Sequence, residues 1–237
     1  MALKNRKPNI AVIIPAHNEE KSIVKVIKEI PKQWVETIIV CSNNSTDNTV
    51  SEAKKAGAIV LEESKKGYGW ACAKGINYAN NMSTKPEIIV FMDGDYSDYP
   101  QELPKVVAPI IKQNIDLVIG SRARGQKEVG SMTFPQRFGN QLSTKLMKLF
   151  YGVTYTDLGP FRAIKLDKLL ALNMQEMTYG WTIEMQIKAA KQKMTYAEVP
   201  VNYKVRIGES KVSGTLKGAI MAGIKILWCI AKYKFKR

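Results

Sequence analysis

The chain has 237 residues and 45% hydrophobic content, enough for one sizeable core, and it has no low-complexity stretch, which excludes a largely disordered protein. Its formal net charge of +15 favours anionic partners, namely nucleic acid, anionic lipid or phosphorylated substrates. The three cysteines fit neither a zinc site nor a disulfide framework, and the first eight residues are too polar for a secretory signal, so we expect a cytoplasmic protein.

Short apolar runs alternate with amphipathic stretches over the first two-thirds of the chain. Strands are predicted at residues 10–15, 37–41, 58–61, 88–92 and 116–119, and helices at residues 18–30, 69–80 and 100–112. A further helix is expected to begin after Asp47 as its N-cap and to run through Ala56. This alternation requires crossover connections, so it predicts an α/β fold in which helices cover both faces of a mostly parallel sheet.

The remainder of the chain has a different pattern. Residues 120–135 form a long polar loop, and loops of this length are usually functional or mobile. Helices are predicted at residues 136–150, 182–191 and 215–235, and extended segments at 159–164 and 198–205. Because no linker interrupts the pattern, we predict one catalytic domain, residues 1–214, followed by a basic amphipathic helix, residues 215–237.

The predicted last helix carries an apolar stripe and a row of lysines on an adjacent face. The stripe consists of Leu216, Ile220, Ile224, Leu227 and Ala231, and the lysines are Lys217, Lys225, Lys232 and Lys236. It lacks an uninterrupted run of about eighteen apolar residues, so a membrane-spanning helix is not expected. The stripe fits packing on the core, on a second subunit, or on an anionic bilayer. We predict peripheral membrane contact as a hypothesis, and the sequence does not indicate the oligomeric state.

An acidic pair, Asp93 and Asp95, comes directly after the predicted strand at residues 88–92. In an extended chain, residues two apart point to the same side, so the two carboxylates repel each other unless a proton or a cation intervenes. Mg²⁺ or Mn²⁺ would satisfy both carboxylates and leave positions open for phosphate oxygens. The alternative is an ordinary turn at Gly94 in which both side chains cap backbone groups. The glycine-rich motifs of dinucleotide oxidoreductases and P-loop NTPases are absent from the sequence.

Four motifs then occur in an order and spacing that resemble those of the family 2 glycosyltransferases, which have the GT-A fold. They are PAHNEE at residues 15–20, SNNSTDNT at 42–49, KKGYGWACAKG at 65–75 and DGD at 93–95. The resemblance implies a Rossmann-like catalytic domain and a nucleotide-sugar site formed by Pro15, Ala16, Asn18, Glu19, Ser42, Asn43, Lys66, Gly67, Asp93 and Gly94. It also implies that Asp93 and Asp95 bind Mg²⁺ or Mn²⁺.

The second half of the chain resembles the dolichyl-phosphate mannose synthase branch, which includes polyprenyl-phosphate glucosyltransferases. The matching segments are GSR at 120–122, TDLGPFRAI at 156–164, EVPVNY at 198–203 and VRIGESKVSG at 205–214. This resemblance implies inverting transfer of a hexose from UDP-glucose or GDP-mannose to a lipid phosphate, whose phosphate would contact Arg122, Arg137, Arg206 and Lys211. The family usually has aspartate at the position of Ser42, so the nucleobase is not predicted, and Ser97 follows the acidic pair where the branch often has glutamine or glutamate.

The candidate catalytic residues are Asp95, Arg122, Arg206 and Glu184. Arginine suits phosphate because its guanidinium is planar and permanently charged. A phosphate acceptor is already ionised, whereas a soluble or glycan hydroxyl acceptor would require a general base. Glu184 is the candidate for that base, and an ion pair with Lys188, one turn later on the same predicted helix, is the alternative. Asp157 is a weaker candidate for the base, or a turn cap.

Three aromatic side chains complete the candidates. His17, the only histidine, is interpreted as a nucleoside or packing contact rather than a metal ligand. Trp70 and Trp181 are candidates for the sugar site, with packing as the alternative. Two other functions are disfavoured: the sequence has no recognisable nucleic-acid-binding module, and it has no glycine-rich triphosphate loop of the kind expected for a nucleotidyltransferase.

Overall fold

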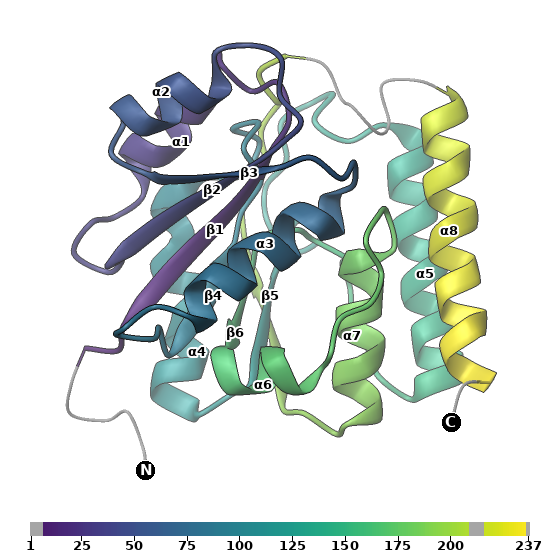
Figure 1. Cartoon of the computed structure of the whole chain (residues 1–237). Coiled ribbons are helices and arrows are strands. Elements are labelled where there is room, and N and C mark those ends of the chain that lie inside the picture. Colours follow the sequence, from purple (N-terminus) through teal and green to yellow (C-terminus); the bar gives the residue numbers. More distant parts are fainter. Residues whose placement is uncertain (1–6, 209–215, 236–237) are drawn as a thin grey trace.

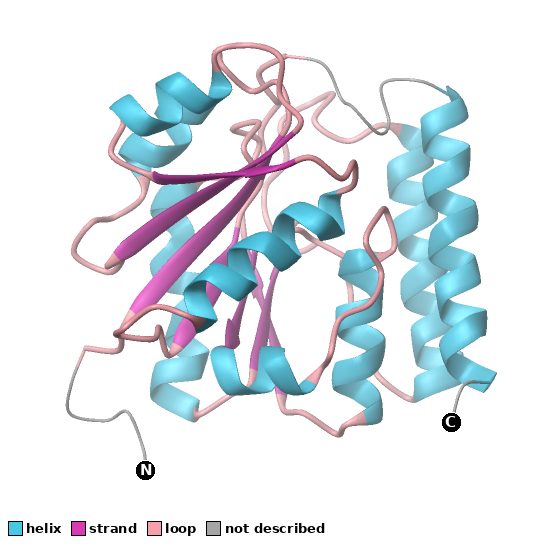
Figure 2. Cartoon of the chain, in the orientation of Figure 1, coloured by secondary structure: helices cyan, strands magenta, loops and turns pink. Residues whose placement is uncertain are grey.

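A mostly parallel sheet forms the centre of the protein (Figures 1 and 2). Within residues 7–208 and 216–235, which the computed structural model describes, seven strands lie in the order β3-β2-β1-β4-β6-β5-β7. β6 is antiparallel to both β4 and β5, and the other neighbours are parallel. The strands are β1 (Ile10–Ala16), β2 (Thr37–Asn43), β3 (Ile59–Glu63), β4 (Ile88–Phe91), β5 (Leu117–Ser121), β6 (Arg162–Lys165) and β7 (Tyr196–Pro200). The predicted α/β fold is confirmed.

Helices cover both faces of this sheet and bury the central strands completely. One face packs against α1 (Ile23–Glu29), α2 (Thr49–Lys55) and α4 (Leu103–Gln113), and the other against α3 (Tyr68–Asn80), α6 (Leu166–Ala171) and α7 (Trp181–Lys191). Alternate residues of β1 enter opposite cores, with Val12 on the first face and Ile13 on the second. Burial on both faces explains why β1 and β4 are apolar runs rather than alternating patterns.

Two long helices, α5 (Phe134–Tyr151) and α8 (Leu216–Phe235), stand side by side against α7 (Figure 1). Tyr151 Oη donates a hydrogen bond to Ile230 O over 2.6 Å. α8 buries Cys229, Ile230 and Tyr233, whereas the described members of the predicted apolar stripe face solvent. The stripe therefore does not pack on the core, because the buried residues lie on the opposite side of the helix. No described helix is long and apolar enough to cross a membrane.

Some boundaries differ from those expected. The helix predicted from residue 18 begins only at Ile23, because Asn18 has a left-handed backbone (φ 55°) and the residues between form turns. Asp47 is not the N-cap of α2, since Asn48 holds that position. Asp47 instead accepts hydrogen bonds from the backbone of Glu20 (3.1 Å) and Thr49 (3.0 Å), and so ties the exits of β1 and β2 together.

Three further elements also differ from the sequence-based predictions. The six-residue helix α6 was missed, and the predicted helix at 100–112 is divided into a short 3-10 turn (Pro100–Glu102) and α4. The extended segment predicted at 198–205 begins earlier, and only Tyr196–Pro200 joins the sheet as β7.

Candidate active site

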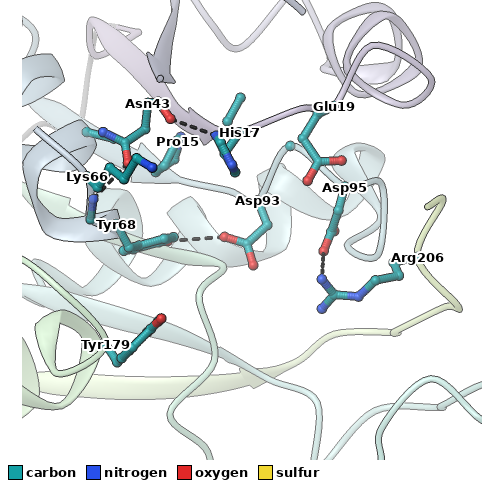
Figure 3. A pocket seen from close by; sticks show the side chains of 14 residues that line it. Pro15, His17, Glu19, Asn43, Lys66, Tyr68, Asp93, Asp95, Tyr179 and Arg206 are labelled. Carbon is teal, nitrogen blue, oxygen red and sulfur yellow. Dashed lines mark hydrogen bonds and ion pairs between the residues drawn. The ribbon is translucent and has the colours of Figure 1, made fainter. Parts of the chain in front are cut away.

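The candidate active site lies at the carboxyl edge of the parallel strands, where the strand order reverses between β1 and β4. Ligands of open α/β sheets bind at such a switch point. A cleft opens there, which we call the central cleft (Figure 3). Its lining residues are Pro15, Ala16, His17, Glu19, Asn43, Lys66, Gly67, Tyr68, Ala71, Asp93, Gly94, Asp95, Tyr179 and Arg206.

The acidic pair faces this cleft, and each carboxylate has partners of its own. Asp93 accepts a hydrogen bond from Tyr68 Oη (3.1 Å). Asp95 is buried and accepts hydrogen bonds through Oδ1 from the hydroxyl (2.6 Å) and the backbone N–H (2.9 Å) of Ser97. Its Oδ2 forms an ion pair with Arg206 Nη1 over 2.8 Å, as Figure 3 shows. The pair is therefore part of an organised cleft floor rather than a solvated turn.

Burial and mutual repulsion perturb the titration of these carboxyls. Asp93 keeps some exposure to the cleft, yet the surrounding protein and the charge of Asp95 raise its pKa to about 6. Asp98 lies beneath them, and burial followed by the charges of Asp93 and Asp95 raises its pKa well above the usual range. The charges of Asp93 and Asp95 thus repel each other at the floor of the cleft, and a cation would relieve that repulsion.

The donor atoms fit a divalent cation that also binds a ligand. Among the described residues there is no group of three or more His, Cys, Asp or Glu side chains placed to hold a metal by themselves. Asp93 and Asp95 offer two carboxylates, and the buried Oδ1 of Asp98 has no hydrogen-bond partner in the described part of the chain. Mg²⁺ usually takes one or two protein carboxylates and completes its shell with water and phosphate oxygens, so the acidic pair fits such an ion.

A second cleft adjoins the first and shares Tyr68, Asp93, Tyr179 and Arg206 with it. We call it the outer cleft, because α5 and α8 form its outer wall. Its other lining residues are Arg122, Met132, Pro135, Gln136, Gly139, Asn140, Leu158, Pro160, Thr178, Thr182, Tyr203, Ala222, Gly223 and Ile226. Its wall is thus largely apolar, and two guanidinium groups lie at its inner end.

Arg122 is held rigidly at this inner end. Its Nε and Nη2 donate to the two oxygens of Asp157 over 2.9 and 2.7 Å, and its backbone N–H donates to Asp157 Oδ2 over 2.7 Å. The guanidinium also lies over the ring of Tyr203, 5.0 Å from the centroid. Asp157 is fully buried, so its carboxylate orients Arg122 and is not placed to act as a base.

Glu184 lines neither cleft, which contradicts its prediction as the general base. Its carboxylate is fully buried and accepts hydrogen bonds from the backbone N–H groups of Gln175 (2.9 Å) and Glu176 (2.7 Å) and from Tyr233 Oη (2.5 Å). The alternative ion pair with Lys188 is present at 2.8 Å. Glu184 therefore fixes residues 172–180, the α6–α7 loop, and no acceptor group can reach it.

The α6–α7 loop in turn packs against the start of α3. A Cβ added at Gly67 would collide with the backbone of Met177, and one at Gly69 with the backbone of Glu176 and Met177. These two glycines allow the loop to lie directly on the turn that leads into α3. The loop also carries Tyr179, which lines both clefts. Glycine at both positions is thus required by close backbone approach.

The structure brings most of the sequence-predicted residues together. The central cleft contains Pro15, Ala16, Glu19, Asn43, Lys66, Gly67, Asp93, Gly94, Asp95 and Arg206, and the outer cleft contains Arg122. Asn18 and Ser42 line neither cleft. Asn18 Oδ1 accepts from Thr46 N over 2.8 Å, and the buried Ser42 donates to Ser45 Oγ over 3.0 Å, so both support the loop after β2.

Other predicted residues are placed elsewhere. Arg137 is exposed on α5 and lines neither cleft, because its position on the helix faces away from the sheet edge. Lys211 lies outside the described residues. Trp70 and Trp181 line neither cleft, and Trp181 is buried with its ring centroid 4.7 Å from that of Phe91, which confirms the packing alternative.

Sequence reasoning missed three tyrosines, Tyr68, Tyr179 and Tyr203. Tyr68 lies inside a motif that was noticed, but its hydroxyl contact with Asp93 spans 25 positions of sequence. Tyr179 and Tyr203 occupy irregular segments whose direction depends on tertiary packing. His17 was predicted at the nucleoside end and lines the central cleft, where its Nδ1 is 2.8 Å from Asn43 O.

The central cleft lies at the carboxyl edge of an α/β sheet, and comparison with known proteins identifies the family. The model of glycosyl transferase family 2 matches residues 11–171, so the chain belongs to this family and is a glycosyltransferase. An uncharacterised glycosyltransferase of Mycobacterium tuberculosis is 32% identical over 90% of this chain and 94% of its own length. A dolichyl-phosphate hexose transferase of Haloferax volcanii is 30% identical over 94% of each chain.

A solved structure confirms the fold. Glucosyl-3-phosphoglycerate synthase from Mycobacterium tuberculosis, in complex with Mn²⁺, uridine diphosphate and phosphoglyceric acid, has a TM-score of 0.75 at 22% identity. The match covers 97% of this chain and 80% of that chain. The predicted GT-A fold is therefore correct.

Proposed function

We propose that this enzyme transfers a hexose, with inversion, from a nucleotide-diphosphate sugar of the UDP-glucose or GDP-mannose type to a polyprenyl or dolichyl phosphate. One observation carries the proposal: the central cleft with its acidic pair continues into an apolar outer cleft, and Arg206 belongs to both. This arrangement suits a polar anionic donor on one side and an amphipathic anionic acceptor on the other.

The donor would occupy the central cleft with a divalent cation. Asp93 and Asp95 would hold Mg²⁺ or Mn²⁺, and the ion, when bound, would neutralise the negative charge that develops on the leaving diphosphate. Pro15 and Asn43 lie on the side of the cleft away from Arg206 (Figure 3), and together with Ala16 and Gly67 they suit the nucleoside. The Mn²⁺ and uridine diphosphate in the glucosyl-3-phosphoglycerate synthase structure support this assignment.

The acceptor would enter through the outer cleft with its phosphate toward Arg122 and Arg206. Asp157 already orients the Arg122 guanidinium, which reduces the entropy lost when a phosphate binds. The apolar wall formed by α5 and α8 suits an isoprenoid chain. The dolichyl-phosphate hexose transferase of Haloferax volcanii supports this choice.

The burial of Glu184 weighs against a hydroxyl acceptor, which would need a base. A lipid acceptor would bring the enzyme, as a peripheral protein, to the cytoplasmic face of a membrane.

Metal binding should release a proton below neutral pH. The pKa of Asp93 is raised to about 6, so in the metal-free protein this carboxyl is protonated below that pH and ionised above it. A cation competes with the proton, so Mn²⁺ affinity should fall by up to roughly tenfold per unit as pH drops through 6. Isothermal titration calorimetry in buffers of different ionisation enthalpy would count the protons released. Equal Mn²⁺ affinity at pH 5 and 8 would contradict this assignment.

The function itself is tested by a transfer assay with separate readouts for donor and acceptor. Purified protein, Mn²⁺ and either labelled UDP-glucose or GDP-mannose are incubated with a short-chain prenyl phosphate, and the label is measured in the organic phase. We expect transfer with one donor, none after chelation by EDTA, and none to the corresponding prenol, which lacks the phosphate.

Thermal-shift measurements with UDP and GDP report donor binding. Failure of both nucleotides to bind with Mn²⁺ would overturn the donor assignment, and donor binding followed by transfer only to a soluble hydroxyl would overturn the acceptor assignment.

A further inference from the structure

We propose that the exposed faces of α5 and α8 together form a docking surface for an anionic lipid bilayer. On α8, the side chains of Ile220, Met221, Ile224 and Trp228 are each 48–57% exposed. On α5, Phe134, Phe138 and Leu149 are each 57–72% exposed. The two helices stand next to each other at one side of the molecule (Figure 1). Seven large apolar side chains exposed on two adjacent helices exceed the scattered single residues of an ordinary surface, and such an excess marks an interaction site.

Each helix presents these side chains as a stripe that follows helical periodicity. Ile220, Ile224, Leu227 and Ala231 recur on α8 at spacings of four, three and four residues, and all four are exposed. The opposite side of α8 is the buried one, with Cys229, Ile230 and Tyr233 packed inward. α8 is thus apolar on two sides, and the protein itself covers only one of them. An ordinary surface helix has a single apolar stripe, which faces the core, so the second, exposed stripe of α8 calls for another partner.

The charges around the stripes select the partner. Neither α5 nor α8 contains an acidic residue, whereas α5 carries Arg137, Lys145 and Lys148 and α8 carries Lys225, Lys232 and Lys234 within their described side chains. Of these, Lys225 forms an ion pair with Glu176 of the α6–α7 loop over 3.1 Å. The Lys232 ammonium lies 4.5 Å from the centre of the Trp228 ring. Apolar side chains bordered by cations, with tryptophan at the border, are the composition of helices that lie in the headgroup region of anionic membranes.

The same two helices form the outer wall of the outer cleft. Pro135 and Gly139 of α5 and Ala222 and Ile226 of α8 line it, close in sequence to the exposed stripes. A bilayer on this surface would therefore lie against the helices that wall the outer cleft, which would bring a lipid phosphate near Arg122. Only this last step rests on the proposed function; the docking surface stands on exposure and charge alone.

Vesicle binding tests the surface directly. The protein is sedimented with vesicles of phosphatidylcholine containing phosphatidylglycerol and, separately, of phosphatidylcholine alone. We expect binding to the anionic vesicles, and Ile224→Glu and Phe138→Glu should each lower the partition coefficient by about tenfold or more. Leu170→Glu, at an exposed apolar position on α6, is the matched control and should bind as the unaltered protein does. Brominated lipid should quench Trp228, and Trp228→Phe should remove that quenching.

Two results would overturn the proposal. One is the absence of binding to anionic vesicles, or equal binding by the unaltered protein and both glutamate variants. The other is a dimer, seen by light scattering, that both variants dissociate, because the surface would then be a subunit interface. A thermal shift with Mn²⁺ and UDP or GDP is measured on every variant: an unchanged shift shows that the fold and the central cleft are intact. If the unaltered protein showed no thermal shift with Mn²⁺ and either nucleotide, that result would count against the proposed function and not against the docking surface.

Discussion

Asp95→Asn is expected to lower turnover by roughly a hundred- to a thousandfold while the fold survives. The substitution keeps the shape of the side chain and its contact with the Ser97 hydroxyl, but it removes one of the two charges proposed to hold the cation. It also breaks the ion pair with Arg206, so that guanidinium is no longer held at the cleft floor. Both changes act on the step in which the diphosphate leaves.

Initial rates at saturating donor, measured over a range of Mn²⁺ concentrations, would report the loss. Asp167→Asn is the matched control, because Asp167 is an exposed aspartate on α6 that lines neither cleft. Circular dichroism and melting temperature would show that both variants fold. If Asp95→Asn turned over at the normal rate, the acidic pair would have no role in binding a cation.

Glu184→Ala should cost roughly 3–5 kcal/mol of unfolding free energy, since it removes the acceptor that satisfies several buried donors. The backbone N–H groups of Gln175 and Glu176, the Tyr233 hydroxyl and the Lys188 ammonium would all lose their partner. For a chain of this length the loss corresponds to a melting temperature lower by roughly 6–20 °C. Calorimetry or chemical denaturation would measure it.

A conservative variant separates this positioning role from catalysis. Glu184→Gln keeps the length of the side chain and one acceptor oxygen, so the enzyme that remains folded should retain kcat within about tenfold. Glu52→Ala is the comparison for stability, because Glu52 makes a partly exposed surface pair with Lys55 that contributes about 1 kcal/mol or less. An unchanged melting temperature for Glu184→Gln together with a loss of several orders of magnitude in kcat would restore the general-base hypothesis.

The strands and the acidic pair were predictable because their signals are local. β1 and β4 are uninterrupted apolar runs, and ligands of open α/β sheets bind beyond the carboxyl ends of the strands, so Asp93 and Asp95 were expected at a binding site. The other predicted residues of the central cleft were implied by the resemblance to family 2 glycosyltransferases. For Glu184, the predicted alternative of an ion pair with Lys188 is present, because their i, i+4 spacing on a helix can be read from the sequence.

The remaining features depend on contacts that local patterns do not encode. The partner that decides the role of Glu184 is Tyr233, 49 residues away, together with the path of the α6–α7 loop. The stripe on α8 was detected, but periodicity does not say which face meets a neighbour, and the side containing Cys229 and Tyr233 was the one buried. α6 is too short to give a periodic signal.

The contact between Tyr233 and Glu184 bears on how this molecule unfolds. It joins the last described helix to the loop that lies on Gly67 and Gly69, so the C-terminal region supports the central cleft through a continuous chain of contacts. Although residues 215–237 were predicted as a separate appendage, melting of α8 would leave a buried carboxylate and the inner side of α7 open to water. Both regions should therefore denature in a single cooperative transition, and hydrogen exchange of α8 and of the α6–α7 loop should report the same opening free energy.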